Sequence, residues 1–350
     1  MILTYEIHHL LWLYHRGKIS SKYLNPKFTQ YHADAWTKFF LEIKKIESKT
    51  AGRYTWAYLD RSGTIPSPVL TLVSLENQLP KINPSFERKS YLDICLARAR
   101  DLINTGKIIN VLWSGGLDST VALFSLLDQC NNIDQLNVVC TFESIIESGS
   151  IFDKYIKDSG LRIKFDQTRL NPGHSFTYDE EDTTQLYVSG CCGDQLFGMS
   201  PGPRAFSLPD KSLLDKWQGI YNTDFISVLE PTFIKSPRPI ENVRDLLWWL
   251  HFNFFWTTAY YDEKRARTPS VAQRLISFYG TQEFQTWAAN TKTYYEKIDQ
   301  YRWPAKQALT ELIDVPYYAM HKKKSMSHTW LINKQWYMMD ENYQNYFIEQ

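Results

Sequence analysis

The sequence predicts an α/β fold whose core is a parallel β-sheet, with a helical C-terminal part and a small N-terminal α+β region. One observation behind this prediction is the stretch from Ile108 to Leu127, in which a β-rich apolar run meets a glycine loop and then a helix-periodic segment. Another is that further short apolar runs alternate with helical patterns, an order typical of parallel sheets with right-handed crossovers. A third is the composition, since 43% of the 350 residues are hydrophobic and 22% are charged, as in ordinary globular proteins.

Charge and cysteine content argue against several classes of partner. The chain has 39 Lys and Arg against 38 Asp and Glu, a formal net charge of +1, which gives no general attraction to nucleic acid or to an anionic membrane. The five cysteines form no C-x-x-C pair, which favours reduced thiols in a cytoplasmic setting over a zinc site. The longest apolar region, 246–261, is interrupted by His251 and Asn253, so we expect no membrane span.

The chain is expected to divide into an N-terminal region, residues 1–85, whose role is unknown, and a larger domain, residues 86–350. Within the first part, Tyr31 to Ile46 has the pattern of an amphipathic helix. Arg53 to Leu75 has the pattern of a β-hairpin, with a turn that includes Arg61-Ser62-Gly63-Thr64. A Pro- and Asn-containing linker then leads into the larger domain.

In the larger domain, a helix over Ser90–Asn104 should feed the first strand of the sheet. From about residue 207 onward the pattern is helical and rich in Trp and Tyr, and we expect these aromatic side chains to pack in the core. Ligands of such parallel sheets bind beyond the carboxyl ends of the strands. The predicted strands are Ile108–Trp113, Leu136–Phe142, Leu161–Phe165 and Gln185–Ser189, with a short helix over Phe152–Ser159.

The loop between the first strand and the next helix reads SGGLDS and has the composition of a phosphate site. The first amides of a helix have no internal partners, and the helix dipole adds positive potential there. Gly115 and Gly116 would let the backbone approach phosphate oxygens, because neither carries a Cβ. The alternative is a simple strand-to-helix turn, and the spacing of a Walker A loop is absent. Further donors and ligands would be the hydroxyls of Ser114 and Ser119 and, for Mg²⁺, the carboxylate of Asp118.

SGGLDS resembles the PP-loop of the ATP pyrophosphatase superfamily, whose members cleave ATP to AMP and pyrophosphate while adenylating a substrate. The resemblance implies a PP-loop core of the adenine nucleotide alpha hydrolase-like type. The fourth predicted strand runs into SGCCGDQLFG, which is similar to the SG-E-G-x-DE-x-FGG signature of the asparagine synthetase family. It implies that Gly190 lies beside the nucleotide and that Asp194 is a second Mg²⁺ carboxylate. Asp118 and Asp194 would then share the metal that binds the pyrophosphate.

Two segments near the C-terminus resemble basic motifs of the same family. Lys306-Gln307-Ala308-Leu309 is similar to K-x-x-L-R, with Thr310 in place of the arginine. The segment from Val315 resembles L-P-x-x-I-x-x-R-x-K, and counting from its proline puts Lys322 at the arginine and Lys324 at the catalytic lysine. The resemblance therefore implies that Lys324 is catalytic, with help from Lys306 and Lys322. The alternative for this Lys-Lys-Lys run is a solvated surface face.

The resemblance covers about residues 90–335, and further departures from the family bear on the reaction. Ile2 stands where the family's glutaminase domain has its catalytic cysteine, so the amine would come from free ammonia, the substrate or a separate amidotransferase. Cys191 replaces the glutamate that follows SG, and Gln195 replaces the glutamate that follows the aspartate. These changes leave the acceptor carboxylate open.

Together, these features predict an ATP-dependent ligase that uses ATP and Mg²⁺. A small-molecule or peptide carboxylate would attack the α-phosphate, and an amine would then displace AMP to form an amide. Leu112 and Thr141, at adjacent strand ends, would flank the adenine. Two alternatives remain: a PP-loop enzyme that acts on tRNA or a nucleobase, and a degenerate protein that binds nucleotide without turnover.

Overall fold

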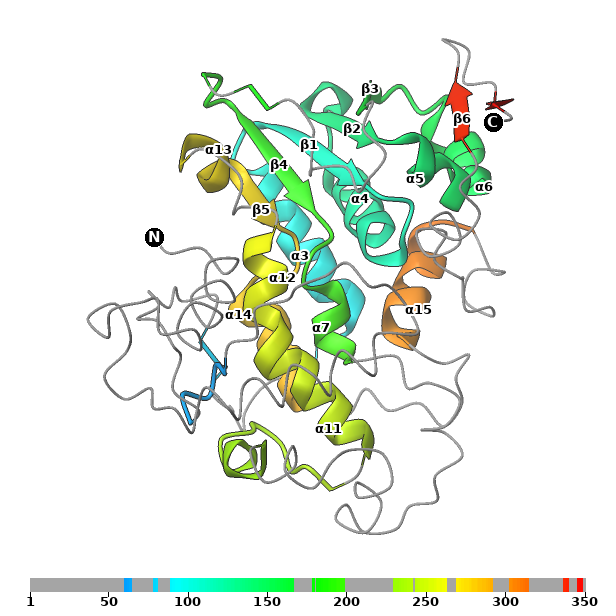
Figure 1. Cartoon of the computed structure of the whole chain (residues 1–350). Coiled ribbons are helices and arrows are strands. Elements are labelled where there is room, and N and C mark those ends of the chain that lie inside the picture. Colours follow the sequence, from blue (N-terminus) through cyan, green and yellow to red (C-terminus); the bar gives the residue numbers. More distant parts are fainter. Residues whose placement is uncertain are drawn as a thin grey trace, which may run out of the picture. The chain divides into compact units, whose positions relative to one another are not determined.

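The computed structural model (Figure 1) describes residues 60–64, 78–80, 89–166, 178–179, 181–198, 229–241, 243–262, 269–291, 302–314, 336–339 and 345–348. The chain divides into two compact units, each assembled from segments that are distant in the sequence. Unit 1 comprises Met1–Ile94, Cys191–Arg267 and Ser277–Pro304, and unit 2 comprises Cys95–Gly190, Thr268–Ile276 and Ala305–Gln350. The predicted helix at 31–46 and both predicted hairpin strands lie outside the described residues.

A five-stranded sheet organises the fold, and its strand order is β3-β2-β1-β4-β5. The pairs β1–β2, β1–β4 and β2–β3 are parallel, which confirms the predicted α/β fold. Five of the six residues of β1 and all of β2 are buried, as expected for strands that are covered on both faces. The strands are β1 (Ile108–Trp113), β2 (Leu136–Cys140), β3 (Arg162–Phe165), β4 (Gln185–Ser189) and β5 (Leu275–Ser277).

A row of polar side chains crosses four strands of this sheet. Asn110 on β1 donates from Nδ2 to Gln185 Oε1 on β4 at 2.8 Å. Its Oδ1 accepts from Asn137 Nδ2 on β2 at 3.0 Å and from Lys164 Nζ on β3 at 2.8 Å. Asn110 lies directly opposite Asn137 in the ladder, so a register slip would break the row. The pKa of Lys164 is lowered, mainly because burial disfavours the charged ammonium.

Helices of unit 2 connect the strands largely as the sequence predicts. The helix expected over Ser90–Asn104 is α3 (Tyr91–Ile103), which begins in unit 1, and α4 (Leu117–Gln129) follows β1. Strand β2 ends two residues before the predicted Phe142, because Thr141 caps the helix that follows. The remaining helical segments are η3 (Ile133–Gln135), α5 (Phe142–Glu147), α6 (Gly149–Ile151), the π-helix η4 (Phe152–Ile156), α13 (Pro269–Arg274) and α15 (Trp303–Leu312), whose first two residues belong to unit 1.

The C-terminal half also contains strands that the helical pattern did not predict. Strand β5 extends the sheet, and its residues alternate buried, intermediate and buried. Leu275 on β5 belongs to a buried cluster with Leu112 and Tyr187, which explains why this short segment pairs as a strand. Two further strands, β6 (Trp336–Met339) and β7 (Asn345–Ile348), form an antiparallel pair. Their runs are rich in aromatic residues, which favour strands.

Unit 1 is built on a continuous helical run with an aromatic core. The run passes from α11 (Val243–Trp249) through the π-helix η5 (Leu250–Phe255) into α12 (Trp256–Asp262). Trp248 Nε1 donates to the carbonyl of Leu196 at 3.1 Å, which joins this run to α7 (Gly193–Phe197). Most of the described aromatic side chains of this run pack in the core, as predicted, whereas Trp303, farther along the chain, is 41% exposed. Those that are fully buried here include Trp248, Trp249, Trp256, Phe252, Phe254 and Tyr279.

The predicted turn at 61–64 is present, and it inserts an arginine among these aromatic residues. Gly63 N donates to the carbonyl of Asp60 at 3.2 Å and closes the turn. Arg61 donates to the carbonyl of Phe252 and to Gln285 Oε1, and its guanidinium lies 4.9 Å from the centre of the Trp256 ring. The turn is thereby fixed to the π-helix.

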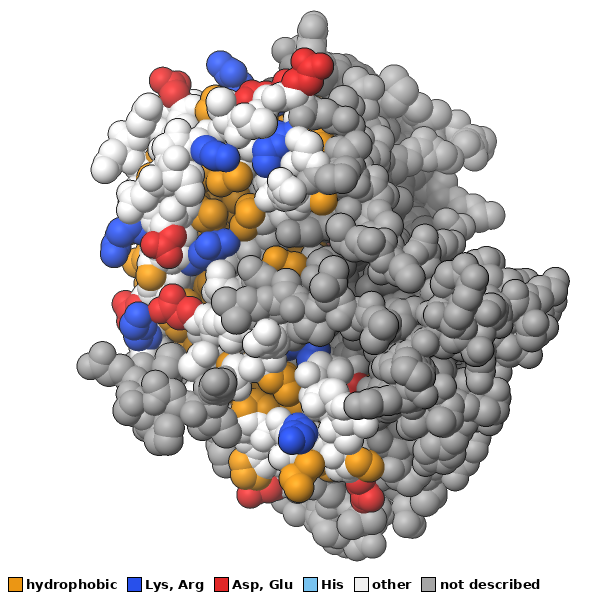
Figure 2. Space-filling view, turned by 90° about the vertical axis from the view of Figure 1, so that its left-hand side faces the viewer, with side chains coloured by type: hydrophobic (Ala, Val, Ile, Leu, Met, Phe, Trp, Pro, Cys, Tyr) orange, Lys and Arg blue, Asp and Glu red, His pale blue; other side chains and the backbone are white. Residues whose placement is uncertain are grey.

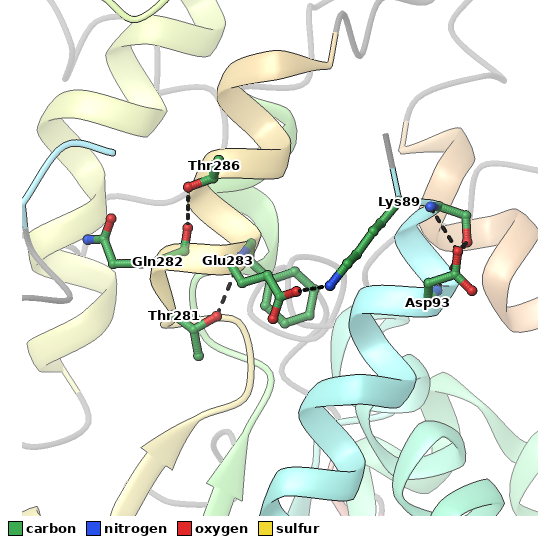
Figure 3. Close-up of polar contacts among 8 residues, drawn as sticks. Lys89, Asp93, Thr281, Gln282, Glu283 and Thr286 are labelled. Atoms are coloured by element: carbon green, nitrogen blue, oxygen red, sulfur yellow. Dashed lines mark hydrogen bonds and ion pairs between the residues drawn. The ribbon is translucent and has the colours of Figure 1, made fainter. Parts of the chain in front are cut away.

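The starts of two unit 1 helices are joined by polar contacts (Figure 3). Lys89 reaches across to Glu283 at the start of α14 (Gln282–Asn290), with 2.9 Å between Nζ and Oε1. Ser90 caps the beginning of α3 by accepting from the Asp93 amide at 3.1 Å, and the Asp93 carboxylate accepts from the Ser90 amide at 3.0 Å. Thr281 caps α14 by accepting from the Phe284 amide at 3.4 Å. The sequence-local caps explain where both helices begin.

Candidate nucleotide-binding site

The predicted phosphate loop lies in unit 2 between β1 and α4, as the sequence indicated. The hydroxyl of Ser119, which is 3% exposed, accepts from the Ser114 amide at 3.1 Å and lies 2.9 Å from the Ser114 hydroxyl. The Ser119 hydroxyl also donates to the Gly116 carbonyl oxygen at 3.1 Å. The two serines, which the sequence assigned to phosphate, therefore shape the loop through bonds to each other.

Trp113 and Thr120 hold the same loop from the helix side, and neither was a predicted site residue. Trp113 is fully buried, and its Nε1 donates to Thr120 Oγ1 at 3.0 Å. Thr120 Oγ1 in turn donates to the Gly116 carbonyl at 2.7 Å. No periodic pattern links positions 113 and 120, so the sequence carried no signal for this pair. Because its N-cap is Gly116, α4 begins without a side-chain cap of its own, as an anion site requires.

Two glycines allow the loop and the neighbouring strand ends to approach one another. Gly115 has φ +74, and a Cβ there would lie 2.3 Å from the carbonyl oxygen of Ser144. A Cβ at Gly190 would lie 2.7 Å from the Ser119 amide nitrogen and 3.1 Å from the Asp118 carbonyl carbon. The structure thus brings Gly190, at the end of β4, against the first turn of α4. Only a glycine permits this approach at either position.

The two residues predicted to flank adenine both have structural partners. Leu112 is 2% exposed and belongs to the buried cluster that also contains Val139 and Tyr187. Thr141 is 1% exposed and forms a capping box with Ser144, accepting from the Ser144 amide at 3.2 Å. Both lie at the carboxyl ends of adjacent strands, as predicted, but their side chains serve packing and capping.

Asp118 can hold a divalent cation together with a nucleotide. It is the second residue of α4, beside the backbone of Gly190. Within the described ranges, no group of three or more His, Cys, Asp or Glu side chains is arranged to hold a metal ion. A cation at Asp118 would therefore take its other ligands from phosphate oxygens and water, which is how Mg²⁺ is commonly bound. The chemistry of this position fits Mg²⁺ bound with ATP.

Asp194 belongs to unit 1, whereas Asp118 belongs to unit 2. Asp194 lies in the first turn of α7 and forms an ion pair with Arg302. The side chains of Asp194 and Arg302 are 45% and 18% exposed, respectively. The sequence assigned no role to Arg302, because 108 positions separate it from its partner. Cys192, the N-cap of α7, has φ +68 at the position where the family signature has its second glycine.

Of the predicted lysines, only Lys306 lies in the described part of the chain. It is 4% exposed, on α15, and its carbonyl accepts from the Thr310 hydroxyl at 3.0 Å. The segment after α15 is tied to η4, because the Tyr155 hydroxyl donates to the Asp314 carbonyl at 2.7 Å. Lys322 and Lys324 lie outside the described residues.

Neither similarity to known proteins nor the surface in Figure 2 identifies a ligand for this loop. No protein-family model matches the chain, and no curated protein matches it either. Among the helices that the structure describes, none has the length and apolar character needed to cross a membrane. On the face in Figure 2, described basic and acidic side chains are interspersed and neither sign forms a continuous patch.

Proposed function

We propose that this protein binds ATP with Mg²⁺ at the loop 114–119 and adenylates a substrate carboxylate, as the first step of amide-bond formation. The observation that carries the proposal is the approach of Gly190 to the Ser119 amide, beside a helix start capped only by Gly116. The end of β4 lies against the first turn of α4, directly after the loop that follows β1. Such a place suits a polyphosphate, because backbone amides can reach its oxygens.

Different residues of unit 2 would bind the phosphates, hold the metal ion and stabilise the transition state. The first amides of α4, with Gly115 and Gly116, would donate to phosphate oxygens, and the Ser114 and Ser119 hydroxyls would join them by leaving their mutual bond. Asp118 would hold Mg²⁺, which neutralises phosphate charge when it is bound. Lys324, helped by Lys306 and Lys322, would stabilise charge that develops on the α-phosphate and the departing pyrophosphate.

The reaction would proceed in two displacements. A carboxylate oxygen of the substrate attacks the α-phosphorus, the bond to the β-phosphate oxygen breaks, and pyrophosphate leaves. An amine then attacks the acyl carbon of the acyl-adenylate, AMP leaves, and the amine gives up a proton to solvent. The amine would be free ammonia, an amine of the substrate, or ammonia from a separate amidotransferase.

A second candidate function is nucleotide binding without turnover. Two contacts favour it: the Ser114 and Ser119 hydroxyls are bonded to each other, and Asp194 is paired with Arg302. Such a protein would bind ATP and release neither AMP nor pyrophosphate. A third reading is an enzyme that acts on tRNA or a nucleobase; the described basic side chains on the face in Figure 2 are interspersed with acidic ones and do not favour a nucleic-acid surface there.

Product analysis tests the proposed function. The full chain is incubated with Mg·ATP, ammonium and the low-molecular-weight fraction of a cell extract, and phosphorus NMR follows the products. We expect AMP and pyrophosphate, whereas ADP with phosphate would contradict the proposal.

Asp118→Asn should weaken Mg·ATP binding by about 1–3 kcal/mol, because a charged partner is lost. Asp128→Asn, on the same helix but exposed at its far end, should leave binding unchanged.

A further inference from the structure

The ion pair between Asp194 and Arg302 lies wholly within unit 1. Arg302 directly precedes α15 and has φ +57, a left-handed conformation that a residue with a side chain adopts at an energetic cost. Such a conformation persists where surrounding contacts require it. The ion pair with Asp194 is one of the contacts that Arg302 makes in this conformation.

A carboxylate held in this way does not fit the role of a magnesium ligand. A guanidinium presents its donors in a planar fork that matches the two oxygens of a carboxylate. The ion pair engages Oδ1 of Asp194, and the positive charge of the guanidinium beside the carboxylate opposes the binding of a metal cation there. The next residue, Gln195, is 8% exposed and neutral, where the family signature has a glutamate. Among the described residues, no cluster of three acidic, His or Cys side chains compensates for this loss.

We propose that Arg302 neutralises Asp194, so that Asp194 is not a metal ligand and this protein uses a single magnesium site, at Asp118. The charge of Asp194 is then balanced by a guanidinium of the same unit, and not by a metal ion. The inference rests on the proposed function, since it concerns how Mg²⁺ is bound with ATP. It reverses the role that the resemblance implies for Asp194.

The first experiment measures Mn²⁺ binding to the full chain by electron paramagnetic resonance, with α,β-methylene-ATP as the uncleavable nucleotide. The wild type should bind a single Mn²⁺ equivalent with the nucleotide, and Asp118→Asn should weaken that binding by about tenfold or more. Asp194→Asn should change the Mn²⁺ affinity by less than about twofold, since its carboxylate is not a ligand. Asp194→Asn weakening Mn²⁺ binding as much as Asp118→Asn would overturn the inference and leave the proposed function intact.

The second experiment needs no nucleotide. Asp194→Asn, Arg302→Met and the double variant form a cycle measured by urea unfolding of the full chain. The effects of the single changes should be non-additive, because each removes the same contact. Strict additivity would overturn the inference, because the two side chains would then be uncoupled. A wild type that binds neither Mn²⁺ nor nucleotide would overturn the proposed function together with the inference. In that case Asp118→Asn would bind as little as the wild type, which distinguishes this outcome from failure of the inference alone.

Discussion

At the scale of single residues, Cys192 has a backbone conformation that suits glycine. Its φ of +68 lies in the left-handed region, and its side chain is only 2% exposed. This conformation costs a residue with a Cβ roughly 1–2 kcal/mol of folding free energy, whereas glycine adopts it without that cost. The turn between β4 and α7 is therefore strained next to the candidate site.

Comparing two variants of Cys192 isolates this strain. Cys192→Ala and Cys192→Gly both remove the buried thiol, but only the alanine keeps a Cβ. We expect Cys192→Gly to be more stable than Cys192→Ala by about 1 kcal/mol in urea unfolding, the reverse of the usual order. An alanine variant as stable as the glycine variant would show that this turn stores no strain.

His251, in η5, should make stability depend on pH. It stacks on Phe255 with 4.6 Å between ring centres, and burial lowers the pKa of its imidazole from 6.5 to about 3. Below pH 6.5 the unfolded chain takes up a proton that the folded chain does not. The free energy of unfolding should therefore be highest above this pH and should fall by about 1 kcal/mol per pH unit as the pH drops further.

The pH dependence is tested with His251→Phe, which keeps an aromatic ring beside Phe255. Urea unfolding of both proteins is measured from neutral pH down to about pH 4.5. The stability difference between wild type and variant should shift in favour of the variant as the pH falls. Parallel curves over this range would mean that the imidazole titrates alike in the folded and unfolded chains.

At the scale of elements, the contact between the turn 60–64 and the π-helix η5 links the N-terminal region to the rest of unit 1. The Arg61 guanidinium donates to the carbonyls of Phe252 and Gln78 and to the side chain of Gln285. Arg61→Met should lower the free energy of unfolding by about 2–3 kcal/mol, because partly buried acceptors lose their donor. Arg100→Met is the control, because Arg100 is exposed and donates from Nε to Gln129 Oε1 at 3.0 Å on the surface; its loss should change stability by at most about 0.5 kcal/mol.

Elements with a strong local pattern could be predicted from the sequence. The helix α3 and the strands β1 and β4 match their predicted bounds to within a residue, because their apolar runs and flanking caps are local signals. The end of β2 was missed, because the capping interaction at Thr141 competes with the strand. Strand β5 was also missed, since it packs with residues far along the chain, and the predicted helix from Phe152 contains a π-helix that the apolar pattern does not distinguish.

In the candidate site, too, features with a local sequence signal could be predicted and features that depend on distant contacts could not. The loop between β1 and α4 follows from a short motif, whereas the close approach of Gly190 to the first turn of α4 is seen only in the structure. The hydrogen bond from Trp113 to Thr120 and the pairing of Asp194 with Arg302 carry no short-range pattern. The roles of Lys322 and Lys324 stay predictions.

At the scale of the whole molecule, each compact unit combines segments that the sequence separates by a hundred residues or more. Linkers and composition are local properties, so they predict a boundary near residue 85, but they cannot show which distant segments assemble; the first boundary between the units falls after Ile94. The central claim concerns unit 2 alone: its strand ends and the start of α4 form a site for Mg·ATP. Gly190 is the position on which this claim depends most.

Calorimetric titration of Mg·α,β-methylene-ATP into the wild type, Gly190→Ala and Gly149→Ala tests this claim most directly. A Cβ at Gly190 would lie 2.7 Å from the Ser119 amide nitrogen, a backbone atom that cannot rotate away, whereas at Gly149 nothing lies within 4 Å. Circular dichroism first confirms that all three proteins are folded. Gly190→Ala should raise Kd by about tenfold or more, equivalent to ~1.4 kcal/mol, and Gly149→Ala should leave it unchanged. Equal affinity in all three proteins, or no binding to the wild type, would contradict the assignment of the nucleotide to this loop.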